Sequence, residues 1–292
     1  MAQAVRKAVI PVAGLGTRFL PTTKAVPKEL LPILDRPLID HAVAEARAAG
    51  LEACILVVGR NEAALRSFFA LDSDLEAELS RKDPGLVAAL KDSEPPPESL
   101  IWVRQDAPLG LGHAVACARE AVGEEPFAVI LPDDLMDADP PCIGQLIDAF
   151  AETGGNVIAV EEVPRAMASR YGILEIGGDD GQLAEVRGLV EKPRPEEAPS
   201  TLAIVGRYVL RPEVFDLLSQ DPAGAGGEIQ LTDAIAGMIG RVPVHGLRFR
   251  GRRFDCGSRA GFVEAQLHFA LGRPEMRDRI SRFVRAETGE WE

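Results

Sequence analysis

Glycines and cations near the start of the chain form a pattern suited to binding phosphate. Residues 13–18 read Ala-Gly-Leu-Gly-Thr-Arg, and Lys28 follows ten residues after Arg18. Gly14 and Gly16 allow a sharp turn that brings backbone N–H groups close to an anion. The guanidinium of Arg18 is a rigid fork of donors that matches phosphate oxygens, and Lys28 adds a point charge. We therefore expect a phosphorylated ligand at this loop, with a plain structural loop as the alternative.

The same glycines could begin a dinucleotide-binding fingerprint, G-x-G-x-x-G. That fingerprint needs a third glycine and a helix that starts directly at it. Phe19 and Leu20 stand in that place, and Pro21 and Pro27 interrupt any helix. The pattern therefore indicates a long phosphate-wrapping loop and argues against an NAD-dependent oxidoreductase.

A pair of carboxylates follows the most apolar predicted strand, at residues 127–131. Pro132, Asp133 and Asp134 come directly after it. Open α/β sheets bind ligands at the carboxyl ends of their central strands, and Mg²⁺ prefers carboxylate and phosphate oxygens. We predict Asp133 as a metal ligand and Asp134 as the second choice, with a turn or helix cap as the alternative.

A second glycine pair lies between a predicted strand at 101–105 and an Ala-rich helix. Residues 105–115 read QDAPLGLGHAV. Backbone N–H groups ahead of a helix can contact a ligand, and the amide of Gln105 has a donor and an acceptor that complement the imide edge of uracil or thymine. An ordinary polar residue at a strand end is the alternative for Gln105. His113 is interpreted as a polar residue near the helix start.

The elements that must position these residues alternate as strand, helix and strand. Apolar runs predict strands at residues 8–12 and 53–58, and helical spacing predicts a helix over 37–49. This alternation predicts a parallel sheet with right-handed crossovers. From residue 171 the predicted strands follow one another through Gly- and Pro-rich turns, which indicates a smaller β-rich subregion. Residues 61–99 are interpreted as a surface excursion, either a connector or a partial cover for the site.

Composition restricts the class of protein. The 292 residues carry a formal net charge of −13, which argues against a nucleic-acid partner. An acidic protein with phosphorylated substrates must gather cations at its site, assisted by a divalent metal. The chain has no apolar window of membrane-spanning length and no signal-peptide pattern at its start. The four cysteines lack C-x-x-C spacing and are interpreted as reduced residues. We expect a cytoplasmic protein with no membrane partner.

Matching blocks from residue 9 to about residue 257 resemble, in order, the sugar-nucleotide pyrophosphorylases. The segment AGLGTRFLPTTKAVPKELLP is most similar to the bacterial UTP–glucose-1-phosphate uridylyltransferases, and PKELLP and GAGGEIQLTDAI favour the uridylyl branch. The resemblance implies an α/β fold with a Rossmann-like, mixed, mostly parallel central sheet, flanked by helices and joined by a smaller β-rich sugar-binding subregion. It implies one domain, in which residues 1–165 mainly bind nucleotide and residues 166–260 mainly bind sugar phosphate. Residues 261–292 would form C-terminal helices with contacts of a homodimer or homotetramer.

The resemblance also implies a set of site residues. Taken alone, Glu191-Lys192-Pro193 would be a solvated strand end; the family pattern favours a role in the site instead. Glu228 has two roles open to it, a cap of the following helix, which is the simpler interpretation, and a sugar contact. The nucleotide would be bound by Ala13, Gly14, Leu15, Gly16, Thr17, Arg18, Lys28, Gln105, Gly110 and Asp133. The sugar phosphate would be bound by Asp134, Gly172, Glu191, Lys192, Val205, Gly206 and Glu228. Mg²⁺ would be held by Asp133 and Asp255, and the catalytic residues would be Arg18, Lys28 and Lys192.

The implied reaction converts UTP and α-D-glucose 1-phosphate into UDP-glucose and pyrophosphate. The sugar phosphate would attack the α-phosphorus in line with the departing pyrophosphate, assisted by Mg²⁺. Its oxygen is already ionised, so a general base is not needed. Arg18 would neutralise the β- and γ-phosphates, Lys28 would bind near the α-phosphate, and Lys192 would screen the repulsion between the substrates. The alternatives are a dTTP-glucose-1-phosphate thymidylyltransferase and a non-catalytic sugar-nucleotide sensor.

Overall fold

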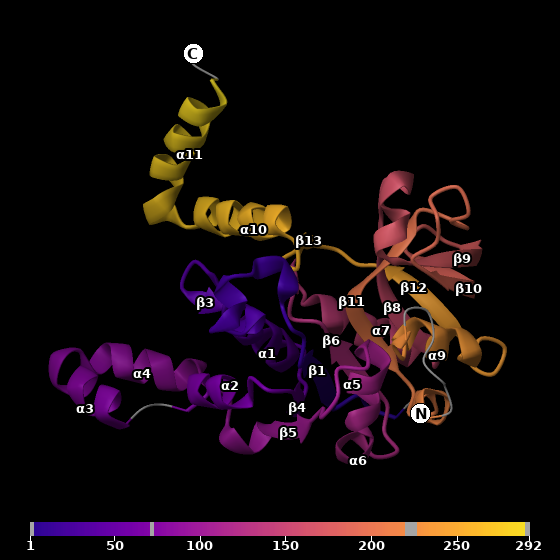
Figure 1. The fold of residues 1–292 in the computed structure, drawn as a ribbon, viewed down its shortest axis with the longest axis horizontal. Coiled ribbons are helices and arrows are strands. Elements are labelled where there is room, and N and C mark those ends of the chain that lie inside the picture. Colours follow the sequence, from indigo (N-terminus) through magenta and orange to yellow (C-terminus); the bar gives the residue numbers. More distant parts are fainter. Residues whose placement is uncertain (1–2, 71–72, 220–226, 290–292) are drawn as a thin grey trace.

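The computed structural model describes residues 3–70, 73–219 and 227–289, so residues 224–226 of GAGGEIQLTDAI lie outside the described part. Within that part, nine strands form one central sheet with helices on both faces (Figure 1). These strands are β1 (Lys7–Val12), β4 (Ala53–Val58), β5 (Leu100–Arg104), β6 (Phe127–Ile130), β8 (Asn156–Glu162), β9 (Gly172–Asp179), β10 (Leu183–Glu191), β11 (Leu202–Leu210) and β12 (Val244–Arg248). Their order is β5-β4-β1-β6-β11-β8-β12-β10-β9, and β11 also pairs with β9.

The sheet is parallel in its first half and mixed in its second. β5, β4, β1 and β6 are parallel, so their carboxyl ends meet at one edge. β11 enters between β6 and β8 and is antiparallel to both. The predicted β-rich subregion continues this same sheet, because β10 pairs with β12 and β9 with β10.

Helices cover the sheet on both faces. The helices of the described part are α1 (Leu38–Ala48), α2 (Glu62–Phe68), α3 (Ser73–Lys82), α4 (Pro84–Ser93), α5 (Leu111–Cys117), α6 (Arg119–Val122), α7 (Cys142–Thr153), α8 (Val214–Leu218), α9 (Leu231–Met238), α10 (Arg259–Gly272) and α11 (Pro274–Thr288). α1 and α7 pack with one apolar core, and α5, α8 and α9 with the other. In β1, Ala8 and Ile10 belong to the first core and Val9 to the second. Burial on both faces explains why the strands are continuous apolar runs.

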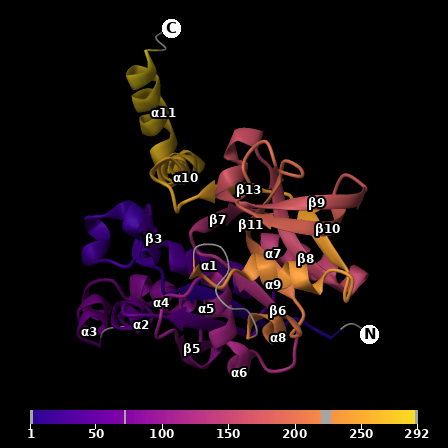
Figure 2. The ribbon, with the colours of Figure 1, turned by 45° about the vertical axis from the view of Figure 1, so that its right-hand side comes forward.

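The excursion at residues 61–99 forms α2, α3 and α4. α3 and α4 lie at the opposite end of the molecule from β9 and β10 (Figure 2). No described residue of this excursion lines either of the two cavities at the strand ends. The connector interpretation is therefore favoured over that of a cover.

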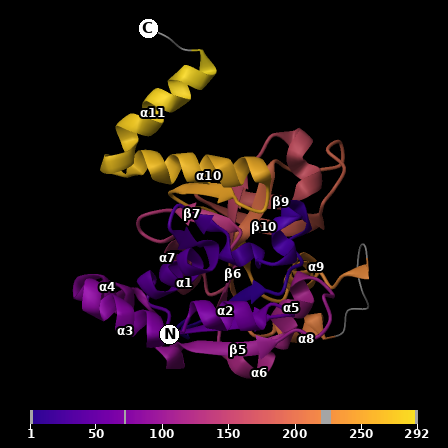
Figure 3. The same ribbon diagram turned by 60° about the vertical axis from the view of Figure 1, so that its left-hand side comes forward.

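Two short ribbons complete the structure. β2 (Pro32–Ile33) pairs with β3 (Arg36–Pro37), and β7 (Asp134–Asp137) pairs with β13 (Arg252–Asp255). α10 lies beside β13, and α11 projects away from the far end of α10 (Figure 3). Among the described residues no helix has both the length and the apolar character needed to cross a membrane.

Candidate functional site

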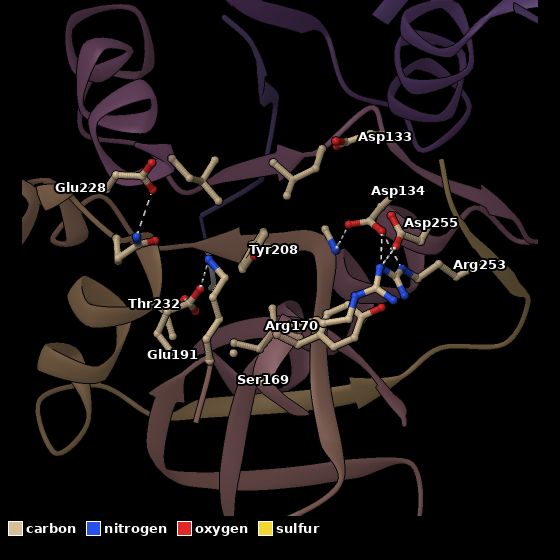
Figure 4. Close-up of a pocket in the computed structure, with 18 of the residues that line it drawn as sticks. Asp133, Asp134, Ser169, Arg170, Glu191, Tyr208, Glu228, Thr232, Arg253 and Asp255 are labelled. Atoms are coloured by element: carbon tan, nitrogen blue, oxygen red, sulfur yellow. Dashed lines mark hydrogen bonds and ion pairs between the residues drawn. The ribbon is translucent and has the colours of Figure 1, made fainter. Parts of the chain in front are cut away.

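Two adjoining cavities open at the ends of the central strands, and Figure 4 shows residues that line the larger one. The larger has a volume of about 550 Å³ and the smaller about 190 Å³. Arg18 and Asp133 line both, so the cavities meet at these two side chains. Among the other predicted site residues, the larger cavity is lined by Asp134, Gly172, Glu191, Lys192, Gly206, Glu228 and Asp255. The smaller is lined by Gly14, Leu15, Gly16, Thr17 and Lys28.

The loop after β1 forms the smaller cavity. Gly16 has a φ of 63°, in the left-handed region that favours glycine. A Cβ at Gly16 would lie 3.0 Å from Cγ2 of Thr23, and a Cβ at Gly14 would lie 3.1 Å from Cε of Lys28. The buried Thr23 hydroxyl donates to the carbonyl oxygen of Gly16 at 2.7 Å. The loop thus closes around the stem of Lys28, and its left-handed φ and close contacts favour glycine at position 16.

Lys28 lies between two carboxylates. Its Nζ is 2.6 Å from Oδ2 of Asp133 and 3.8 Å from Oε1 of Glu29. Burial opposes the charge of Lys28, but Asp133 and Glu29 outweigh it and raise the pKa of Lys28 above its ordinary value. Burial also opposes the charge of Asp133, and Lys28 outweighs it, so the pKa of Asp133 is lowered. An ammonium and a carboxylate therefore stand charged where the cavities join.

Asp133 and Asp255 approach a common point beside Gly257. A Cβ at Gly257 would lie 3.2 Å from Oδ2 of Asp133, 3.1 Å from Oδ1 of Asp255 and 3.1 Å from Nη1 of Arg18. The described residues contain no group of three or more His, Cys, Asp or Glu side chains that could hold a metal ion. Two carboxylates fit a hard divalent cation that completes its shell with substrate phosphates and water. The donor set is therefore suited to a metal that arrives with its phosphorylated ligand.

Two arginines that the sequence analysis did not single out also line the larger cavity. Arg170 ends the 3₁₀ helix η5 (Arg165–Arg170), and its Nη2 is 2.9 Å from Oδ2 of Asp255 (Figure 4). Arg253, in β13, donates from Nε to Oδ1 of Asp134 at 2.6 Å. In the sequence, Arg170 is marked only by its place just before the predicted β-rich subregion, and Arg253 only by its place two residues before Asp255. Neither position is a specific signal.

Asp134 is engaged on both oxygens. Besides Arg253 at Oδ1, the backbone N–H of Gly206 donates to Oδ2 at 3.0 Å. Burial raises the pKa of Asp134, against the opposing charge of Arg253. A Cβ at Gly206 would lie 2.5 Å from the same Oδ2, so the close approach of β11 to the end of β6 requires glycine there. Asp134, which follows β6, thus links the middle of β11 to β13.

The end of β10 directs an acid and a base into the same cavity. Lys192 has a φ of 47°, and this left-handed residue breaks the alternation of the strand. Its Nζ therefore comes within 3.2 Å of Oε1 of its neighbour Glu191. The other oxygen of Glu191 accepts from the Thr232 hydroxyl at 2.9 Å. Lys192 is left with a half-exposed ammonium in the cavity, close to the inner wall formed by β11.

Val205 does not line the cavity, although it was predicted as a sugar-phosphate contact. Its side chain is buried in the core with α1 and α7. Side chains alternate along β11, so Ile204, Gly206 and Tyr208 face the cavity while Val205 faces away. The neighbours of Val205 in the sequence, Ile204 and Gly206, line the cavity in its place.

Glu228 lines the larger cavity and does not cap α9. Its Oε2 accepts from Nε2 of Gln230 at 3.2 Å, and Gln230, at the N-cap position, makes no side-chain cap. The capping alternative is therefore not observed, and the carboxylate is oriented at the cavity wall by its neighbour.

Ala13, Gln105 and Gly110 line neither cavity in the described part of the chain. Ala13 follows β1 and Gln105 follows β5, so both lie at the same edge of the sheet as the loop at residues 14–18. Gly110 has a φ of 104°, and a Cβ there would lie 2.8 Å from the carbonyl oxygen of Ile229. The second glycine loop is thus packed against the segment that contributes Glu228 to the larger cavity.

The chain matches a known protein family over most of its length. Residues 7–270 match the family model described as nucleotidyl transferase. The chain belongs to the nucleotidyl transferase family. This family membership and the α/β fold class were both predicted from the sequence, and both predictions are confirmed.

Similar proteins show which members of the nucleotidyl transferase family this chain resembles. A UTP–glucose-1-phosphate uridylyltransferase of Komagataeibacter xylinus is 51% identical over 260 residues, covering 89% of this chain and 92% of the relative. The UTP-bound UDP-glucose pyrophosphorylase (UGPase) of Acinetobacter baumannii superposes with a TM-score of 0.88 at 40% identity, covering 96% of this chain and 98% of that one. A UDP-glucose pyrophosphorylase complexed with UDP-glucose superposes with a TM-score of 0.82 at 37% identity, covering 92% and 100% of the two chains. These relatives confirm the prediction of a uridylyltransferase enzyme.

Proposed function

We propose that the chain transfers UMP from UTP to α-D-glucose 1-phosphate, giving UDP-glucose and pyrophosphate. The observation that carries this proposal is the meeting of two cavities at Arg18 and Asp133. Each cavity has its own ammonium group, Lys28 in the smaller and Lys192 in the larger. Two phosphorylated substrates therefore have separate anion sites with a common boundary, which suits transfer between them.

Positioning and charge neutralisation supply the catalysis. The attacking sugar-phosphate oxygen is already ionised, so no side chain has to remove a proton. Arg18 binds the departing β- and γ-phosphates, Lys28 holds the α-phosphate region, and Lys192 screens the two anions from each other. Held in this way, the sugar phosphate lies in line with the α-phosphorus and opposite the leaving pyrophosphate.

We assign Mg²⁺ as the divalent metal and Asp133 and Asp255 as its protein ligands. When bound, the ion would neutralise phosphate charge at the reacting centre. The common approach of both carboxylates to one point beside Gly257 supports the assignment. Each carboxylate also has a cation beside it, since Nζ of Lys28 is 2.6 Å from Asp133 and Nη2 of Arg170 is 2.9 Å from Asp255.

The base of the nucleotide is assigned to the edge of the sheet where Ala13, Gln105 and Gly110 lie. Glu191 and Glu228 are placed at the sugar hydroxyls, and Gly172 leaves room for the ring. A Cβ at Gly172 would lie 3.1 Å from Oε2 of Glu191, so any side chain there would fill the space beside that carboxylate. Residues 1–165 then serve the nucleotide and residues 166–260 the sugar phosphate.

The C-terminal helices are assigned to self-association as a homodimer or homotetramer. No residue of α11 is buried within the described chain, although the helix carries apolar side chains. We place the reaction in the cytoplasm, because all four cysteines are free thiols.

One assay tests the reaction. Purified protein is incubated with glucose 1-phosphate, Mg²⁺ and either UTP or dTTP, and released pyrophosphate is measured. Release with UTP at a higher kcat/KM than with dTTP is expected. Preference for dTTP would assign a thymidylyltransferase, and binding of UDP-glucose without pyrophosphate release would assign a sensor.

A further inference from the structure

The side chain of Gln105 is held in one orientation by two acceptors. Its Nε2 lies 3.3 Å from the carbonyl oxygen of Gly110 and 2.9 Å from Nδ1 of His113. A carbonyl oxygen can only accept, so the amide nitrogen of Gln105, and not its oxygen, must face Gly110. Gln105 is 7% exposed, so the two acceptors hold its amide within the protein.

This arrangement determines which ring nitrogen of His113 accepts a hydrogen bond. Both hydrogens of the Gln105 Nε2 are directed to acceptors, so Nδ1 of His113 accepts a hydrogen bond and carries no proton. The proton of the neutral ring is then on Nε2, which lies 3.8 Å from Sγ of Cys117, a weak sulfur acceptor. His113 therefore serves as a hydrogen-bond acceptor for Gln105.

The oxygen of the amide is left for a ligand. No described residue donates to Oε1 of Gln105, and this oxygen is not sealed from solvent. The sequence predicts that Gln105 offers both a donor and an acceptor to a base. In the structure the amide NH₂ is used within the protein, so only the amide oxygen remains for a ligand. An oxygen can pair with the N3–H of uracil or thymine, whereas cytosine has an acceptor at N3 and would place two lone pairs against each other.

We propose that His113 is a positioning residue that sets base specificity, by locking the Gln105 amide so that it accepts from an imide N–H and rejects cytosine. The inference rests on the proposed function, which places the nucleotide base at Gln105. His113 is not required to build its helix: the N–H of Gly112 donates to Ile229 at 2.8 Å, and Ala114 and Val115 provide the buried contacts of α5.

Three variants test the proposal by steady-state kinetics with UTP, dTTP and CTP. His113→Leu removes the acceptor and keeps an apolar side chain. The remaining contact of Nε2 with the carbonyl oxygen of Gly110 is long, at 3.3 Å, and holds the amide only weakly on its own. The amide can then turn its NH₂ toward the base, so we expect kcat/KM for CTP relative to UTP to rise about tenfold, which is the order of one hydrogen bond. The change should appear in KM more than in kcat. The dTTP-to-UTP ratio should not move, because uracil and thymine have the same N3–H.

His113→Asn is the rescue variant. Its Oδ1 can occupy the position of the imidazole Nδ1 and accept from Gln105, so the CTP-to-UTP ratio should return toward that of the wild type. Thermal unfolding of each variant shows whether it is folded. In the double variant with Gln105→Leu, the His113→Leu change should add nothing further to the loss of discrimination.

Gln105→Leu distinguishes a failure of the base assignment from a failure of the role proposed for His113. We expect it to reduce discrimination against CTP by at least as much as His113→Leu. An unchanged ratio in Gln105→Leu would show that this residue does not read the base, and would remove the base assignment together with this inference. A changed ratio in Gln105→Leu but not in His113→Leu would overturn the role of His113 alone. An equal loss with all three nucleotides in His113→Leu would show a merely structural role and would also overturn it.

Discussion

The backbone conformation of Lys192, rather than its side chain, determines that this residue lies at the cavity. Its left-handed φ of 47° ends β10, and its N–H donates to the carbonyl oxygen of Tyr171 at 3.0 Å. Alanine meets the same steric conditions at this φ as lysine, so substitution at the Cβ and beyond leaves the strand end intact. The ammonium can therefore be tested without changing the local structure.

We predict that Lys192→Ala folds normally and loses roughly 10²–10³ in turnover, the cost of removing one preorganised charge donor. The matched control is Arg194→Ala, a cation two residues further on that is paired with Glu197 and does not line the cavity. Initial rates and unfolding midpoints of both variants are compared with the wild type. Near-normal turnover in Lys192→Ala would contradict the assignment.

Asp133 is the carboxylate through which a metal would act on both cavities. Asp133→Asn keeps the shape and removes the charge, so we predict a folded protein that needs much more Mg²⁺ for half-maximal rate. Direct Mn²⁺ binding, followed by paramagnetic resonance, should weaken in parallel. Asp137→Asn is the control, since Asp137 lies on β7 and pairs with His268. Unchanged metal dependence in Asp133→Asn would remove this residue from the metal site.

Glu29 makes the stability of the fold depend on pH. It is 1% exposed, both carboxylate oxygens lack hydrogen-bond partners among the described residues, and burial raises its pKa from 4.5 to about 7. Between these values the folded state keeps a proton that the unfolded chain has lost. The free energy of unfolding therefore falls as pH rises from 4.5 to about 7, by about 3 kcal/mol in total.

Glu29→Gln should remove this titration. We predict a flatter profile of unfolding free energy between pH 5 and pH 8, and a variant more stable than the wild type at pH 8. Urea unfolding at several pH values measures it, with the exposed Glu78→Gln as the control. Parallel profiles for Glu29→Gln and the wild type would show that Glu29 does not titrate in this range.

At the scale of elements, one buried ion pair joins α1 to the site. Nη2 of Arg207, in β11, is 2.7 Å from Oε2 of Glu45 in α1, and its Nη1 donates to the carbonyl oxygen of Leu131 at 2.9 Å. Leu131 directly precedes the turn that carries Asp133. Arg207 is 1% exposed, so its charge depends on Glu45.

Glu45→Ala should lose about 3–5 kcal/mol of unfolding free energy, because it leaves Arg207 buried and uncompensated. The double variant Glu45→Leu with Arg207→Met should lose less than Glu45→Ala, since no unpaired charge then remains in the core. Urea denaturation of the three proteins measures the difference. A loss below 1 kcal/mol in Glu45→Ala would show that water or a rearrangement compensates the guanidinium.

Elements also determine which parts of the site the sequence can predict. Asp133 and the 14–18 loop are predictable, because each directly follows an apolar strand and parallel strand ends share an edge. The pairings of Arg253 with Asp134 and of Arg170 with Asp255 are not, since they join residues 119 and 85 positions apart. Local periodicity carries no information on such contacts. For the same reason the sequence did not predict that β11 lies between β6 and β8.

At the scale of the whole molecule, the acidic chain concentrates cations where anions must bind. Against a net charge of −13, Arg18, Lys28, Lys192, Arg170 and Arg253 surround the two joined cavities. Local fields of this kind act on a bound ligand more strongly than the distant surface does, because salt screens charges beyond a Debye length of about 8–10 Å. The overall charge thus remains compatible with polyphosphate substrates.

α11 projects beyond this body and carries a stripe of apolar side chains (Figure 3). Met276, Ile280 and Phe283 recur at helical spacing, and Phe283 is 59% exposed. Phe283→Glu should therefore convert the proposed homo-oligomer into single chains, while circular dichroism stays unchanged because Phe283 is exposed and not part of the buried core. Light scattering coupled to size exclusion measures the mass, and Arg282→Gln on the same helix is the control. A wild type with the mass of one chain, or an unchanged oligomer in Phe283→Glu, would show that α11 has another role.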